Sequence, residues 1–146
     1  MRIAGTWRTC DDGVARPVLR GVLFDTRGKP FTEWFLIDTG ADQTVLSGAV
    51  YFRLGSRGRR PDGAQRLMGI GGASDFVLIT TEAEITRDDG QVVKIRGEIA
   101  AFTDAAATDF SVLGRDVLDN FDLVVSRRKD EICMLAGNHG YRVEAA

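Results

Sequence analysis

The segment WFLIDTGADQTVLS, residues 34–47, carries one aspartate at the end of an apolar run and then turns sharply. Asp38-Thr39-Gly40 is ordinary turn chemistry, because aspartate bonds to nearby backbone N–H groups and glycine accepts positive φ angles. A carboxylate delivered by a buried strand can also act as a general acid or base, and an acid/base pair needs a second titratable group beside it. The segment therefore raises the question of where the partner of Asp38 lies.

Two further segments stand out later in the chain. LMGIGGASDF, residues 67–76, places a glycine-rich tip between two strand-like arms. It lacks the Lys-Ser/Thr of a P-loop and the full dinucleotide fingerprint, so it is a poor phosphate site. SVLGRDVL, residues 111–118, is an apolar strand that ends at Gly114 and enters a short helix. Each segment by itself has a purely structural explanation.

In this order, the three segments resemble the retropepsin-like aspartic proteases, the family of the retroviral proteases and their cellular relatives. The resemblance rests on Asp-Thr-Gly-Ala continued by DQTVL, on the glycines of GIGG, and on Val112-Leu113-Gly114 leading into RDVL. It implies an all-β, single-lobe acid-protease fold, which is a closed β-barrel or sandwich with a β-hairpin flap and one or two short helices. It also implies an aspartic endopeptidase that uses no cofactor and no metal.

The proposed chemistry needs two carboxylates that share one proton, so that one activates a water while the other donates a proton. The chain has one Asp-[Thr/Ser]-Gly, and its other aspartate turns, CDDGV, PDGA and RDDGQ, do not follow an apolar strand into such a turn. We therefore expect Asp38 to meet Asp38 of a second copy across a two-fold axis. A homodimer of this kind is the commonest soluble assembly.

The resemblance implies supporting roles around Asp38. The Thr39 hydroxyl is expected to cross to the other subunit, and Gly40 brings backbone close to the carboxylates. Asp42 and Arg115 are expected to form an ion pair that braces the loop, with two independent surface charges as the alternative. The residues implied for binding a peptide or protein substrate are those beside the catalytic turn and in the flap: Ala41, Gly69, Ile70, Gly71, Gly72 and Leu113.

Alanine at position 41 bears on the pH dependence of activity. Pepsin-like relatives often carry Ser or Thr at this place, where a hydroxyl donates to the carboxylate and favours its charged form. Ala41 lacks that donor. We therefore expect an activity optimum nearer weakly acidic to neutral pH than strongly acidic pH.

The rest of the chain predicts the elements that position these residues. Stretches rich in β-branched and aromatic residues, bounded by turn chemistry, predict strands at 16–24, 32–37, 75–85, 91–102, 121–126 and 132–136. Short helices are expected at 47–55, with Ser47 as N-cap and Gly55 as stop, and at 115–121. We expect one domain, 1–146, with an N-terminal extension at 1–15, a flap at 65–80 and a tail at 137–146.

Composition excludes several classes of function. The net charge of −2, from 19 basic and 21 acidic side chains, predicts no nucleic-acid or membrane partner. Cys10, Cys133 and the single histidine, His139, lack the spacing of a disulfide framework or a zinc site, and His139 is expected to be a bystander. The N-terminus has no apolar leader, so a cytoplasmic location is expected.

Two alternatives to an ordinary protease stay open at this point. The fold could serve as a dimeric peptide-binding or regulatory module with little or no turnover, since a fold does not guarantee a function. The chain could also be a regulatory protease that acts on one partner or after self-processing. In that case residues 1–15 are a candidate inhibitory segment.

Overall fold

The structure, a computed structural model, describes residues 1–56, 58–60, 67–69, 72–104, 110–142 and 144–145. Within them most of the regular structure is β. The strands are β1 (Arg2–Ala4), β2 (Thr6–Thr9), β3 (Ala15–Phe24), β4 (Pro30–Ile37), β5 (Val45–Leu46), β6 (Leu67–Gly69), β7 (Gly72–Ser74), β8 (Phe76–Thr86), β9 (Val92–Phe102), β10 (Ser111–Leu113), β11 (Asp122–Ser126) and β12 (Glu131–Leu135). The helices are α1 (Gly48–Leu54) and α2 (Arg115–Leu118).

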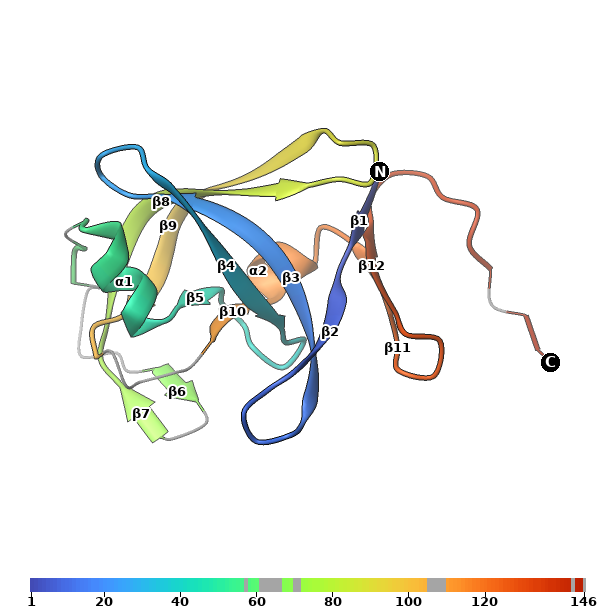
Figure 1. Cartoon of the computed structure of the whole chain (residues 1–146), viewed down its shortest axis with the longest axis horizontal. Helices are drawn as coiled ribbons and strands as arrows, with labels where there is room; N and C mark the ends of the chain where they lie inside the picture. The colour runs from blue at the N-terminus through green and yellow to red at the C-terminus, as the bar shows by residue number, and fades with distance from the viewer. Residues whose placement is uncertain (57, 61–66, 70–71, 105–109, 143, 146) are drawn as a thin grey trace.

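Six strands close into a barrel, in the order β3-β4-β10-β5-β9-β8 (Figure 1). The closing contact is antiparallel pairing of β3 with β8, at Val22↔Glu84 and Leu23↔Ala83. A long hairpin of β8 and β9, in register from Phe76↔Phe102 to Thr86↔Val92, forms one wall. The expected all-β closed barrel with short helices is confirmed.

The barrel interior holds the main hydrophobic core. Leu19, Phe35, Ile79 and Leu113 come from four different strands and are each at most 2% exposed. Burial of a side chain of this size stabilises the fold by about 1.5–3 kcal/mol. β4, which leads into the turn at Asp38, and β10, which pairs with β4, therefore rest on the packed core.

The first fifteen residues differ from the expectation. The sequence indicated an extension before a first strand at residue 16, whereas the structure places β1 and β2 there. Ile3 of β1 pairs opposite Met134 of β12, and Trp7 of β2 pairs opposite Pro17 of β3. β1, β12 and β11 form a separate three-stranded sheet, and β2 extends the barrel sheet. These residues are thus integrated into two sheets, which does not favour a removable inhibitory segment.

The helices begin where the sequence predicts. The Ser47 side chain caps α1 by accepting from the Val50 N–H at 3.2 Å, and Gly55 ends it in the left-handed region at φ 70°. α2 is shorter than expected and ends at Leu118. The Asn120 side chain donates to the carbonyl oxygens of Asp116 and Val117, so it satisfies the last turn and stops the helix there.

The expected flap region contains a short hairpin. β6 and β7 pair in register from Leu67↔Ser74 to Gly69↔Gly72. In Figure 1 this hairpin lies at the same lower end of the barrel as the end of β4. Ile70 and Gly71, the expected tip, lie outside the described residues.

The chain after β12 runs outward from the barrel (Figure 1), and the His139 ring bonds to the Asp122 carboxylate. None of the helices in the described part of the chain is long and apolar enough to span a bilayer.

Candidate active site

Asp38 follows the last residue of β4 and begins a tight turn. Its own N–H donates to the carbonyl oxygen of Leu113 on β10 at 3.2 Å, and its carbonyl oxygen accepts from the Ala41 N–H at 3.2 Å. The Gly40 N–H donates to Asp38 Oδ1 at 2.9 Å. A backbone N–H therefore holds the carboxylate in place. Asp38 is half-buried, so its side chain still reaches solvent.

A side chain at position 40 would come close to the Asp38 carboxylate. A Cβ at this position would lie 3.2 Å from Asp38 Oδ1, which is tight for a carbon against a carboxylate oxygen. An added Cβ would therefore require the Asp38 carboxylate to shift by a few tenths of an ångström. Thr39, the residue before Gly40, is exposed on the surface of the chain.

The loop after Asp38 is tied to the β10–α2 junction by backbone hydrogen bonds. The Arg115 N–H donates to the Ala41 carbonyl oxygen at 2.8 Å, and the Asp116 N–H donates to the Asp42 carbonyl oxygen at 3.2 Å. Farther along, the Ser47 N–H donates to Ser111 Oγ at 3.0 Å in a buried site. Hydrogen bonds thus join two segments that are far apart in sequence, 38–47 and 111–116, into one connected unit around Asp38.

Thr44 and Asp116 connect the same two segments through side chains. The Thr44 N–H donates to both carboxylate oxygens of Asp116, at 2.9 and 3.0 Å, and its hydroxyl donates to Oδ1 at 2.7 Å. The hydroxyl also accepts from the Gly114 N–H at 3.1 Å. Neither residue was predicted from the sequence as part of the site. The available signal was the aspartate in the first turn of the short helix, where carboxylates are favoured near unpaired N–H groups.

Gly114 is required by close backbone packing. A Cβ there would lie 2.4–2.9 Å from the backbone N, C and O atoms of Gln43. Since those atoms belong to the backbone, they cannot rotate away as a side chain could. The glycine of Val112-Leu113-Gly114 therefore permits the Asp38 loop to rest directly on the β10–α2 junction.

The expected ion pair between Asp42 and Arg115 is present. Arg115 Nη2 donates to Asp42 Oδ1 at 2.7 Å. Both side chains are largely exposed, at 81% for Asp42 and 54% for Arg115. The pair lies at the surface of the isolated chain, next to the two backbone hydrogen bonds described above.

The residues expected to bind substrate are placed in different ways. Ala41 is half-buried beside the turn, and Gly69 pairs with Gly72 at the end of the β6–β7 hairpin. Leu113 was expected to line a cleft, but its side chain is 1% exposed and packs in the barrel core. Its contribution to the site is the carbonyl oxygen that holds the Asp38 N–H.

Across the described ranges, no group of three or more His, Cys, Asp and Glu side chains is arranged to hold a metal ion. What the arrangement provides is a fixed, solvent-accessible carboxylate on a well-braced loop. A single such carboxylate can act as a general acid or base, and it needs a partner for paired acid/base chemistry.

Among known proteins, the chain is similar to solved structures of aspartic proteases. No protein-family model matches the chain, and no curated protein matches it significantly. Among solved structures, the EIAV protease in complex with an inhibitor is 31% identical over 71% of this chain and 86% of its own, with a TM-score of 0.44. A retropepsin-like aspartic protease from Rickettsia conorii is 17% identical over 92% of this chain and 90% of its own, with a TM-score of 0.56.

These two likenesses support different conclusions. The EIAV protease is similar to this chain in sequence, at 31% identity, whereas its TM-score of 0.44 is too low to compare the two folds. The Rickettsia protein is distant in sequence and counts for its fold. The identity, the closed barrel and the three motifs agree, and the chain therefore belongs to the retropepsin-like aspartic protease family.

Proposed function

We propose that the chain is an aspartic endopeptidase that works as a homodimer, with Asp38 of each copy forming the catalytic pair. The observation that carries the proposal is the setting of Asp38 at the end of a core strand: its half-buried carboxylate accepts from the Gly40 N–H, and its backbone N–H donates to the Leu113 carbonyl oxygen. The chain has one Asp-Thr-Gly, so a pair of equivalent carboxylates requires a second copy.

The proposed mechanism follows from two like charges held close together. Two adjacent carboxylates do not both ionise at moderate pH, and aspartic proteases are the established example of a pair that shares one proton. The ionised Asp38 takes a proton from a water as it attacks the peptide carbonyl carbon. The protonated Asp38 gives its proton to the carbonyl oxygen, and proton transfer to the amine nitrogen then releases the two products.

The surrounding residues have supporting roles in this proposal. Thr39 is exposed in the single chain, which leaves its hydroxyl free to contact the partner subunit as the family resemblance implies. Asp42 and Arg115 brace the loop from outside. Ala41 borders the bound peptide, and the segment of Gly69, Ile70, Gly71 and Gly72 closes over it as a flap.

The test is the pair Asp38→Asn and Asp119→Asn. Both changes remove one negative charge, but Asp119 is an exposed residue at the end of α2. We expect the wild type and Asp119→Asn to cleave a diverse peptide library at weakly acidic to neutral pH, and Asp38→Asn to show no cleavage. Sedimentation should show that all three form dimers.

Two further measurements separate the enzyme from a binding module. Activity per chain should fall on dilution below the dimer dissociation constant, since mass action removes the paired site. A peptide mimic with a hydroxyl in place of the attacked carbonyl should inhibit. If the wild type cleaves nothing and binds peptides as tightly as Asp38→Asn does, the chain is a binding module and the proposal is wrong.

A further inference from the structure

One edge of β9 is left open where its neighbour ends. Throughout its length β9 pairs with β8 on one side. On the other side β5 pairs with it at Ala100 and Ala101, and β5 is only two residues long. Within the described ranges, no backbone hydrogen bond joins residues 92–98 to any segment on this second side. Alternate N–H and C=O groups of this stretch are therefore available to another strand.

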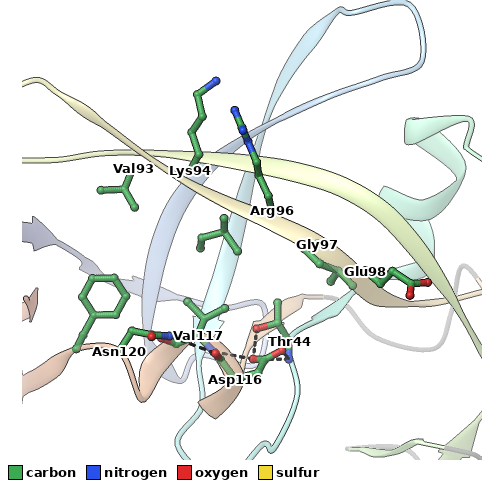
Figure 2. Close-up of a pocket in the computed structure, with 12 residues that line it drawn as sticks. Thr44, Val93, Lys94, Arg96, Gly97, Glu98, Asp116, Val117 and Asn120 are labelled. Carbon is green, nitrogen blue, oxygen red and sulfur yellow. Dashed lines mark hydrogen bonds between the residues drawn. The ribbon is translucent and has the colours of Figure 1, made fainter.

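The open edge borders a groove. A cavity of about 360 Å³ lies between β9 and α2 (Figure 2). The turn that follows α2 also borders it. Its apolar lining includes the half-buried side chains of Val93, Ile95, Val117 and Phe121. A volume of this size is in the range of ligand-binding sites in proteins. We call this feature the β9–α2 groove.

The charges around the groove are unequal on its two sides. Lys94 and Arg96 point away from α2 in Figure 2, and both are paired with Glu82. Glu98 is paired with Arg59 through two hydrogen bonds, at 2.5 and 3.0 Å. All three side chains belong to the β9 side of the groove lining, and their charges are already paired with Glu82 or Arg59.

The α2 side presents oxygen acceptors. Asp116 forms no ion pair with any described residue, and its Oδ2 accepts only from the Thr44 N–H. Asn120 uses its amide N–H₂ group on two carbonyl oxygens of α2, which leaves its side-chain oxygen as an acceptor. Both residues are exposed and line the groove. A ligand that complements both the open β9 edge and these acceptors is an extended backbone that carries a cationic side chain.

We propose that the β9–α2 groove binds an extended segment of another protein, which adds as a strand along residues 92–98 and directs a lysine or arginine at Asp116 and Asn120. An added strand lies about 4.8 Å from its neighbour and alternates its side chains. One set therefore reaches the apolar lining, and main-chain hydrogen bonds to β9 supply affinity, as in other cases of strand addition. This site is separate from Asp38 and goes beyond the proposed cleavage of peptides.

The experiment uses the Asp38→Asn protein throughout, so binding is measured whether or not the wild type cleaves. The probe is a blocked heptapeptide of alternating threonine and valine with lysine at its centre. Two control peptides carry glutamate at the centre or N-methyl groups at alternate backbone nitrogens. Amide chemical shifts locate the contact, and fluorescence anisotropy gives the dissociation constant.

We expect the lysine peptide to shift the amides of residues 92–98 and 116–121, and both control peptides to bind at least about tenfold more weakly. Asn120→Lys adds one positive charge inside the groove and should weaken the lysine peptide about tenfold. Asp119→Asn changes the net charge equally but lies outside the groove lining, and should change binding by less than about twofold.

Three results overturn the proposal. The first is no shift in residues 92–98 at millimolar peptide, or shifts confined to the Asp38 loop. The second is equal binding of the lysine and N-methylated peptides, which excludes strand addition. The third is shifts in residues 92–98 that depend on protein concentration without peptide, which assigns the edge to a second copy of this chain.

Discussion

Thr44 donates both its backbone N–H and its hydroxyl to the carboxylate of Asp116, a residue 72 positions away in sequence. Thr44 is 3% exposed, so these two donors have little access to water. The hydroxyl also accepts from the Gly114 N–H, which completes a closed set of bonds. Asp116 is therefore the acceptor that satisfies the buried donors of the loop carrying Asp38.

Replacing Asp116 by alanine should leave the N–H and hydroxyl donors of Thr44 without their acceptor. We expect Asp116→Ala to lower the free energy of unfolding by about 2–3 kcal/mol, because charged acceptors form the stronger hydrogen bonds and a buried donor without a partner is costly. Asp116→Asn keeps one acceptor oxygen and should lose less. Urea unfolding measures both, with Asp119→Ala as the control, expected within about 0.5 kcal/mol of the wild type. Equal losses at positions 116 and 119 would contradict the assignment.

The Asp42–Arg115 pair should contribute much less to stability than the Thr44–Asp116 pair. Its distance is as short, at 2.7 Å, but the two side chains are 81% and 54% exposed. Water and salt screen a pair of this kind, so a double-mutant cycle of Asp42→Asn and Arg115→Leu should give a coupling of about 1 kcal/mol or less. The coupling should shrink further in high salt. A salt-independent coupling of about 2 kcal/mol or more would show that the pair is shielded from solvent.

Gly114→Ala should move the Asp38 loop. The added Cβ meets backbone atoms of Gln43 at 2.4–2.9 Å, so the two segments must separate. We expect a loss of about 1–3 kcal/mol in unfolding free energy, the usual cost of overpacking, and altered amide shifts from residue 38 to residue 44. Gly140→Ala is the matched control, since nothing lies within 4 Å of its Cβ position. A Gly114→Ala protein as stable as Gly140→Ala would disprove the steric reason.

The barrel strands were predictable from local sequence. β3, β4, β8 and β9 begin and end within two residues of the predicted ranges, because turn residues such as Asp25, Gly28 and Gly90 mark their ends. Ser47 and Gly55 likewise define α1 by capping chemistry that acts within a few residues. Signals of this kind depend only on near neighbours in the chain.

The parts that the sequence did not predict depend on distant partners. β1 and β2 have three and four residues, too short for a periodic pattern, and they exist because Ile3 and Trp7 pair with strands elsewhere in the chain. Local sequence assigns no role to Thr44 or Asp116, because the bond between them joins positions 72 residues apart. The Asp42–Arg115 pair was anticipated only through the family resemblance.

Glu33 should make stability depend on pH in an unusual direction. Its carboxyl lies partly buried on β4, and burial raises its pKa above the ordinary value of 4.5, although the Trp34 N–H bond to Oε1 at 3.1 Å opposes the shift. A raised pKa means that the folded state holds the proton more tightly than the unfolded state. The ionised group therefore costs stability above the folded pKa, and this cost disappears as pH falls through that value.

We expect Glu33→Gln to be more stable than the wild type at neutral pH, since glutamine keeps the acceptor oxygen and removes the buried charge. The difference should vanish on acidification below 4.5. Glu98→Gln is the control of opposite sign: hydrogen bonds from Arg59 lower the pKa of Glu98, so its contribution is present at neutral pH and is lost in acid. Thermal unfolding over a pH series compares the two variants. If Glu33→Gln is less stable at neutral pH, or differs from the wild type by the same amount at every pH, burial is not the dominant influence on Glu33.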